Sequence, residues 1–381
     1  MAETAEDDTD DLAQRRDEVS GKLERLRELM WRRGVDALHL TTIANTAWLT
    51  AGAATYVDES VDTAACALLV TPDAAVVLTD PIEEPRLRAE ERLDALGFGF
   101  VVEPWYARGQ ALRQRVGARR LGADTATAPS HTRVDMSADL TAMRSLLTAG
   151  EQRRLRAGAA HAADAMWEAI HALAPGMTEL DAAAALAAAS RRRGGAATVT
   201  LVGSDDRIAR FRHPLPTAKV IERQTMLVLC LRFQGLISAL TRTVYFGEAP
   251  ESVRSLADAV ARVDAEVIAA TRPGRTLGEL YDLLRAAYAR EGAPDAIEQH
   301  HQGGTIAYLG RETLARPGSL THIEVGQAFA WNPSLRGAKS EDTILLTAAG
   351  PDILTTMEGW PTLAIETGAG VIARPAILEV H

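Results

Sequence analysis

The chain of 381 residues is long enough for two domains or one large one, and its composition, 47% hydrophobic and 24% charged, is typical of a soluble globular protein. Acidic residues outnumber basic ones by 51 to 41, and no basic stripe is present, which argues against nucleic acid as a partner. The sequence has no apolar run of about 18 residues, so no membrane-spanning segment is predicted. The acidic N-terminus is unlike a secretion signal. Cys66 and Cys230 lie in apolar runs, so we interpret them as buried thiols in a cytoplasmic, reducing compartment.

The first 147 residues divide into a leader and an α/β domain. Residues 1–18 are acidic and poor in apolar residues, which predicts a disordered leader. From residue 19 to 147, helical and strand-like patterns alternate, as in an α/β domain. The expected order is a helix ending near Gly34, strands over 35–40, 64–70 and 74–78, and helices over 85–96 and 107–116.

Residues 148–381 contain a sequence that occurs twice. Pro175-Gly-Met-Thr178 and Pro273-Gly-Arg-Thr276 each open a helix, and each is preceded by an amphipathic helix, over 153–173 and 253–270. Strand-like sequence follows both copies. This self-similarity predicts an α+β domain with an internal pseudo-twofold duplication and a cleft where the halves meet. The alternative is that Pro-Gly before a helix is common punctuation and implies no duplication.

Histidine is scarce, so its positions are informative. His213 lies in a proline-flanked loop, which suits a positioned acid or base, although a lone loop histidine is usually only a surface residue. His300 and His301 precede Gly303 and Gly304, which would let the backbone approach a ligand closely.

Two charged residues near predicted strands complete the set of candidates. Arg311 follows Tyr308 and a glycine, and an arginine at such a turn can hold a carboxylate through two parallel hydrogen bonds; the alternative is a surface arginine. Glu341 begins the last of three predicted strands, over 235–247, 329–333 and 340–346. An acidic residue there needs a polar partner or a function, unless it marks a solvated strand end.

Together these segments resemble the creatinase/aminopeptidase P/methionine aminopeptidase family, the M24 pita-bread fold, over residues 20–350. The residues that carry the resemblance in the N-terminal part are Gly34–Leu38, Asn45 and Leu49–Gly52. The duplicated second half matches the catalytic domain of the family. The resemblance implies a creatinase-type α/β domain, a pita-bread catalytic domain and a homodimer.

Metallopeptidases of this family hold two metal ions with two Asp, one His and two Glu side chains, which are hard oxygen ligands plus an imidazole. The corresponding residues in this chain are, in order, Val228, Ala239, His300, Asn332 and Glu341. One imidazole and one carboxylate cannot neutralise two divalent ions. The resemblance therefore implies a member without its metal site, and we expect no metal and no other cofactor.

Creatinase is a metal-free member and offers a second comparison. Its strand Thr-Ala-Leu-Glu-Arg-Thr corresponds to Ser238–Thr243, with the same alanine at the ligand position. Its catalytic His aligns with His213, its second active-site His with His300, and its carboxylate-binding Arg with Arg311. Both glutamates that grip its guanidinium are absent. Because Thr241 and Asn332 replace them, we expect a substrate that is neutral at that end.

We predict a metal-independent enzyme that acts on a small carboxylate-bearing substrate, by C–N hydrolysis or a related elimination or cyclisation. The resemblance implies His213, His300 and Glu341 as catalytic residues, with His213 as acid or base, and the substrate-binding residues Arg311, Asn332, Thr241 and Tyr308. Two alternatives remain, a metal-dependent Xaa-Pro peptidase and a non-catalytic binding module that kept the fold.

Overall fold

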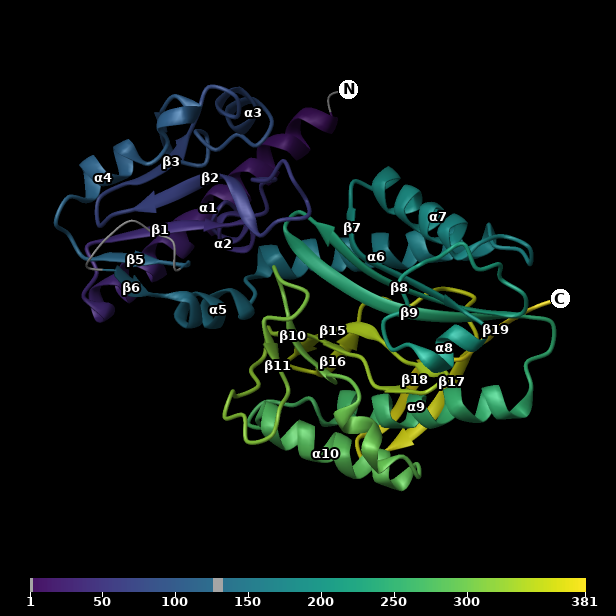
Figure 1. Ribbon diagram of the computed structural model, residues 1–381. Helices are drawn as coiled ribbons and strands as arrows, with labels where there is room; N and C mark the ends of the chain where they lie inside the picture. Colours follow the sequence, from purple (N-terminus) through teal and green to yellow (C-terminus); the bar gives the residue numbers. More distant parts are fainter. Residues whose placement is uncertain (1–2, 126–132) are drawn as a thin grey trace. The chain divides into compact units, whose positions relative to one another are not determined.

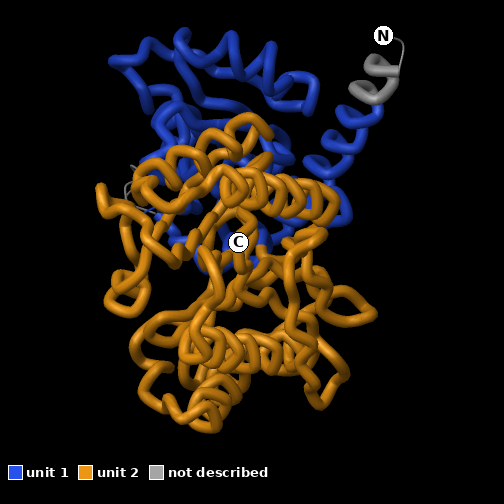
Figure 2. Tube along the Cα trace, turned by 90° about the vertical axis from the view of Figure 1, so that its right-hand side faces the viewer, with its two compact units in different colours: residues 1–144, 148–151 blue, residues 145–147, 152–381 orange. Residues whose placement is uncertain are grey.

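The computed structural model describes residues 3–125 and 133–381, with side chains from residue 10 onward. The chain divides into two compact units, which Figure 2 shows in different colours. Unit 1 contains residues 1–144 and 148–151, and unit 2 contains residues 145–147 and 152–381. In the described residues, no helix is both long and apolar enough to span a bilayer.

Unit 1 is an α/β domain built on a six-stranded sheet (Figure 1). The strand order is β4-β3-β2-β1-β5-β6, with β1, β2 and β3 antiparallel and the remaining neighbours parallel. Its strands are β1 Ala37–Thr42, β2 Thr63–Val70, β3 Ala75–Thr79, β4 Gly99–Val102, β5 Leu121–Ala123 and β6 Arg133–Asp135. Its helices are α1 Glu3–Arg33, α2 Ile43–Leu49, α3 Glu84–Ala89, η1 Trp105–Ala107, α4 Gln110–Val116 and α5 Ser137–Ser145. The predicted α/β class is confirmed, and Cys66 is buried and free as expected.

The N-terminal segment differs from the disordered leader that we expected over residues 1–18. Helix α1 begins at Glu3 and continues without a break to Arg33, although residues 1 and 2 lie outside the described part. Good helix formers occupy Leu12–Arg16, and the acidic residues before them lie near the helix N-terminus, where negative charge stabilises the helix dipole. Arg15 donates to the carbonyl of Glu91 at 3.3 Å, and Val19 is buried, so the first turns extend a helix that is anchored from Arg15 onward.

The first half of unit 2 packs two helices on a four-stranded sheet of order β19-β9-β8-β7. Its elements are α6 Ala149–His171, α7 Glu179–Arg192, β7 Ala196–Ser204, α8 Asp206–Arg210, β8 Gln224–Phe233 and β9 Leu236–Phe246. Apolar side chains of α6 and α7 pack on the sheet around Leu227, Leu229 and Leu240. Cys230 on β8 is buried and free, as predicted.

The second half repeats this plan with helices α9 Glu251–Ala270 and α10 Leu277–Arg290 (Figure 1). Its five-stranded sheet has the order β11-β10-β12-β15-β16. The remaining elements are η2 Pro294–Glu298, β10 Gly303–Ile306, β11 Thr313–Leu314, β12 Ala328–Trp331, β13 Ser334–Leu335, β14 Ala338–Lys339, β15 Asp342–Thr347 and β16 Gly350–Ile353. Thr178 and Thr276 both form capping boxes, with Asp181 and Glu279, which accounts for the repeated motif.

The two halves meet where β9 contacts β15. Thr241 forms an isolated antiparallel bridge with Glu341, and the Ala239 N–H donates to Oγ1 of Thr343 at 2.7 Å. This contact line, which we call the seam, places Thr241 beside Glu341 although 100 residues separate them. The predicted pita-bread class with its internal duplication is therefore confirmed.

The segment after residue 354 folds back into unit 2 as β17 Thr362–Thr367, β18 Gly370–Pro375 and β19 Leu378–Val380. Strand β19 pairs in parallel with β9, opposite Val244–Phe246. Arg374 is fully buried and forms ion pairs with Asp264 at 2.6 Å and Asp342 at 2.7 Å. This segment therefore completes both a sheet and a buried charge network, which the sequence patterns did not reveal.

Candidate active site

His213 is held by the loop that follows helix α8. The Val202 N–H on β7 donates to the carbonyl of Pro214 at 3.1 Å. Pro214 also packs over Gly203, where an added Cβ would lie 2.7 Å from the proline ring. The Pro-flanked loop is therefore fixed against the sheet next to His213.

Three imidazoles gather at the end of this loop. Nε2 of His213 lies 2.9 Å from Nε2 of His300, and the ring of His301 stacks on that of His300 with a centroid distance of 4.5 Å. One candidate ligand nitrogen from each of the three histidines lies within 4.8 Å of the others. The structure thus joins two predicted residues, 87 positions apart, and adds His301, which we had not assigned to the site.

The glycines after these histidines have a different function from the one that we expected. Gly303 has φ 98°, and a Cβ there would lie 2.1 Å from the carbonyl oxygen of Ala330; at Gly304 the nearest oxygen, of Thr313, would lie at 2.0 Å. These glycines allow β10 to pack closely between β12 and β11, and this packing accounts for them without a ligand.

The surroundings keep all three histidines in the neutral form. Burial, followed by the Lys339 charge, lowers the pKa of His300 to about 3. Burial and then Arg311 lower the pKa of His301 to about 4, and burial followed by Lys339 lowers the pKa of His213. Within the His213–His300 pair, one neutral nitrogen must donate its hydrogen and the other accept it.

Glu341 is 2% exposed at the seam, and both of its oxygens have partners. Arg311 Nη2 lies 2.8 Å from Oε1, while Lys339 Nζ lies 3.1 Å from Oε2, which also accepts from Thr241 Oγ1 at 2.8 Å. Burial by itself would raise the pKa of this carboxyl, but Lys339 and Arg311 lower it to about 2. Glu341 is therefore a fixed anion at neutral pH.

This cluster of Glu341, Arg311 and Lys339, which we call the charge cluster, carries two cations and one anion. The side chain of Lys339 is 4% exposed and that of Arg311 is 16% exposed. Because the histidines beside the charge cluster are neutral, one positive charge remains uncompensated by these groups. We did not predict Lys339, although its position two residues before Glu341, on the same face of an extended segment, could have indicated it.

The remaining predicted residues lie in two environments. Asn332 is 2% exposed, its N–H donates to the carbonyl of Gln302 beside the histidines, and its Oδ1 has no hydrogen-bond partner in the part of the chain that the structure describes. Tyr308 is also buried; its hydroxyl accepts from Arg154 at 3.5 Å, and its N–H donates to Glu312. These contacts of Tyr308 fix the turn before Arg311.

Apolar side chains occupy the two remaining positions that the resemblance matched to metal ligands. Val228 on β8 pairs with Thr241 across the sheet, and Ala239 on β9 pairs with Cys230. Both side chains are almost fully buried. Glu341 is therefore contacted by two cationic side chains and the Thr241 hydroxyl. The two positions that would supply metal-binding carboxylates carry the apolar side chains of Val228 and Ala239.

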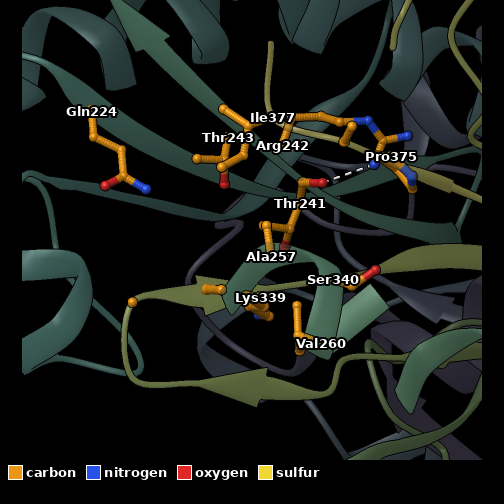
Figure 3. A pocket seen from close by; sticks show the side chains of 13 residues that line it. Gln224, Thr241, Arg242, Thr243, Ala257, Val260, Lys339, Ser340, Pro375 and Ile377 are labelled. Carbon is orange, nitrogen blue, oxygen red and sulfur yellow. Dashed lines mark hydrogen bonds between the residues drawn. The ribbon is translucent and has the colours of Figure 1, made fainter. Parts of the chain in front are cut away.

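A small cavity lies next to the charge cluster, with Thr241 and Lys339 in its wall (Figure 3). Gln224, Thr243 and Ser340 also line it, and Pro375–Ile377 of the C-terminal segment close it. Its volume of about 20 Å³ suits a single water molecule rather than a substrate. The three histidines are not among its lining residues.

The fold is a creatinase-type α/β domain followed by a pita-bread domain, whose buried polar groups meet at the seam. The sequence profile of metallopeptidase family M24 matches residues 153–348, and that of the creatinase/prolidase N-terminal domain matches residues 22–155. The chain belongs to metallopeptidase family M24.

The chain is also similar to two curated proteins and to a solved structure. Agropine synthesis cyclase of Rhizobium rhizogenes is 29% identical over 172 residues, which are 42% of this chain and 43% of that protein. An Xaa-Pro dipeptidase of Pyrococcus furiosus is 29% identical over 171 residues, 42% of this chain and 47% of that protein. The matched stretches thus span less than half of either relative. The crystal structure of the Pyrococcus horikoshii prolidase has a TM-score of 0.74 at 19% identity, covering 89% of this chain and 99% of that one.

Proposed function

We propose that this M24-family enzyme acts without a metal ion on a small substrate that bears a carboxylate. The reaction is C–N hydrolysis, or an elimination or cyclisation that uses the same groups, with His213 as the acid and base. The observation that carries this proposal is the neutral His213–His300 pair near a charge cluster with excess positive charge.

The histidine pair supplies the proton transfer. His213 is the more exposed of the two, so it is the more easily protonated, while burial and then the charge of Lys339 keep His300 neutral. In hydrolysis, His213 takes a proton from water as the oxygen bonds to the substrate carbon. It then returns the proton to the nitrogen as the C–N bond breaks. His300 orients the ring of His213 through the contact between their Nε2 atoms.

The charge cluster supports a substrate carboxylate. Burying an unpaired charge is costly, and a carboxylate near Arg311 and Lys339 would neutralise the excess positive charge. Arg311 is already bound to Glu341, so it would share its guanidinium between the two carboxylates rather than serve the substrate alone. Oδ1 of Asn332, which has no partner among the described residues, supports a substrate that also bears an N–H donor.

Two observations favour a metal-free site over the dinuclear site of the metallopeptidases. Val228, Ala239 and Asn332 supply no carboxylate, and both oxygens of Glu341 are bound to cationic side chains. A divalent ion would have to displace Lys339 or Arg311 and remain next to the displaced charge. The donor set therefore does not fit two metal ions. The name of the cyclase relative supports the cyclisation form of the proposed reaction, whereas the name of the dipeptidase relative supports the competing peptidase function.

The test begins with the purified protein, metal analysis and a thermal-shift screen of carboxylate-bearing amides and guanidino compounds. Compounds that raise the melting temperature are then assayed for turnover with and without chelator. We expect turnover that resists chelation, that His213→Ala abolishes and that His171→Ala leaves unchanged, since His171 lies exposed on α6.

Two outcomes would overturn the proposal. Loss of activity on chelation that manganese or cobalt restores would indicate the metal-dependent peptidase. If some compounds bind specifically but none of them is converted, the protein is a binding module.

A further inference from the structure

A second cavity lies wholly within unit 1, on one face of the six-stranded sheet. Its volume of about 320 Å³ is at the lower end of the range for small-molecule sites. Strands β1, β2 and β3 form its floor, and the segment from Glu103 to Arg113 forms its rim. None of its lining residues belongs to the candidate active site.

The cavity exists because helix α4 is too short to cover this face. Leu112 and Val116 of α4 pack against Leu69, Leu78 and Leu121, which closes one end of the sheet. Further along the same face the floor carries small side chains, among them Ala65 and Ala67. Small side chains beside a seven-residue helix leave space that larger residues would have filled.

His39 supplies a polar group to the floor. It lies on β1 two residues from Ala37, so strand alternation places its side chain on the same face as the α4 contacts. The imidazole is 8% exposed, and its Nδ1 has no hydrogen-bond partner within residues 3–125 and 133–381. Burial lowers the pKa of His39 against the opposing effect of Asp124, so the ring is neutral. An unpaired buried imidazole is costly, and a ligand atom that bonds to it would offset that cost.

The rim adds positive charge. The carboxylate of Glu103 accepts the backbone N–H groups of Gly109 and Ala111, and Arg108 is paired with Asp80. In contrast, the Arg113 guanidinium makes no hydrogen bond or ion pair in the described part of the chain. Its side chain is exposed at the rim of the cavity, on the last turn of α4.

We propose that this cavity binds a small monocarboxylate with an apolar or aromatic body. The carboxylate pairs with Arg113, the body lies on Ala65, Ala67 and Leu78, and a polar atom contacts His39. A fork-shaped guanidinium beside an apolar floor selects an amphipathic anion over a purely polar one. This site is separate from the proposed active site and does not depend on the proposed reaction.

The test uses the full chain and two probes of similar shape, 3-phenylpropionate and 3-phenylpropanol, with affinities measured by isothermal titration calorimetry. We expect the carboxylate to bind at least tenfold more tightly than the alcohol. Arg113→Gln should weaken carboxylate binding at least tenfold, whereas Arg115→Gln, on the same helix but outside the lining, should leave it unchanged. Ala67→Leu should fill the floor and abolish binding of both probes, with circular dichroism reporting the fold.

Because the proposed active site also attracts carboxylates, Arg311→Gln locates the binding event. Binding that survives Arg311→Gln and is lost in Arg113→Gln supports the cavity in unit 1. The proposal is overturned if neither probe binds the wild-type chain at millimolar concentration, or if Arg113→Gln has no effect. It is equally overturned if Arg311→Gln alone abolishes binding.

Discussion

Replacing Glu341 by glutamine tests whether the charge cluster is an ionised and mutually stabilised group. The variant keeps the shape of the side chain but leaves Lys339 and Arg311 without their shared anion. The pKa of Glu341 falls from 4.5 to about 2. At about 1.4 kcal/mol per pH unit, that difference corresponds to about 3 kcal/mol. Breaking a buried ion pair from one side costs a similar 3–5 kcal/mol or so. We therefore expect Glu341→Gln to lower the free energy of unfolding by about 3 kcal/mol at pH 7.

The assay is urea unfolding followed by circular dichroism, repeated from pH 7 to pH 3. A carboxyl with a lowered pKa contributes its full stability above its unfolded pKa, near 4.5, and loses it as pH falls toward 2. The gap between wild type and Glu341→Gln should thus be constant from pH 7 to about pH 5 and shrink below that. Glu366→Gln, at an exposed position of β17, is the matched control and should change stability little.

A double variant sharpens this test. Lys339→Met combined with Glu341→Gln should recover much of the lost stability, because it removes the cation that the single variant leaves unpaired. A drop no larger than that of Glu366→Gln, or a gap that does not shrink in acid, would refute the ionised cluster that we describe.

Three further predictions concern the same unit. Burial lowers the pKa of His300 to about 3, so as pH falls the unfolded chain binds a proton at this residue before the folded protein does. The free energy of unfolding should therefore decrease as pH drops from 6.5 toward 3. His300→Gln should make this quantity less dependent on pH over that range. Arg374→Met should lower the free energy of unfolding in urea by about 3–5 kcal/mol, since Asp264 and Asp342 lose their buried partner. A loss no larger than that caused by Arg285→Met, at an exposed arginine, would contradict the buried charge network. Gly303→Ala should lower the melting temperature strongly or prevent soluble expression, because its Cβ would meet the Ala330 carbonyl at 2.1 Å, whereas Gly310→Ala, with open space around it, should be tolerated.

Local signals predicted much of the fold. The periodicity of residues 253–270 and the Thr-capped motifs identify helices because their contacts lie within one or two turns. The same reasoning failed for residues 3–18, where a low apolar content hid a helix that is anchored further along the chain. It also failed for the C-terminal strands, whose partners, such as β9, lie far away in sequence.

The candidate site was predictable as a set of residues but not as a set of contacts. The resemblance brought His213 and His300 together, and their Nε2 atoms are in contact. It assigned Arg311 to the substrate alone, however, and gave no role to Lys339. Arg311 contacts Glu341 from 30 residues away, and no local pattern encodes that contact. The contact with Lys339 lies within two residues, and strand alternation could have indicated it.

The parallel pairing of β19 with β9 also affects when unit 2 can mature during synthesis. Strand β9 ends at Phe246, yet its edge stays open, and Asp264 and Asp342 stay without Arg374, until Val380 has left the ribosome. The residues of unit 1, by contrast, all lie before residue 152. During translation, a finished first unit would therefore precede a nascent second unit with an exposed strand edge, which is the stage at which chaperone protection would matter most.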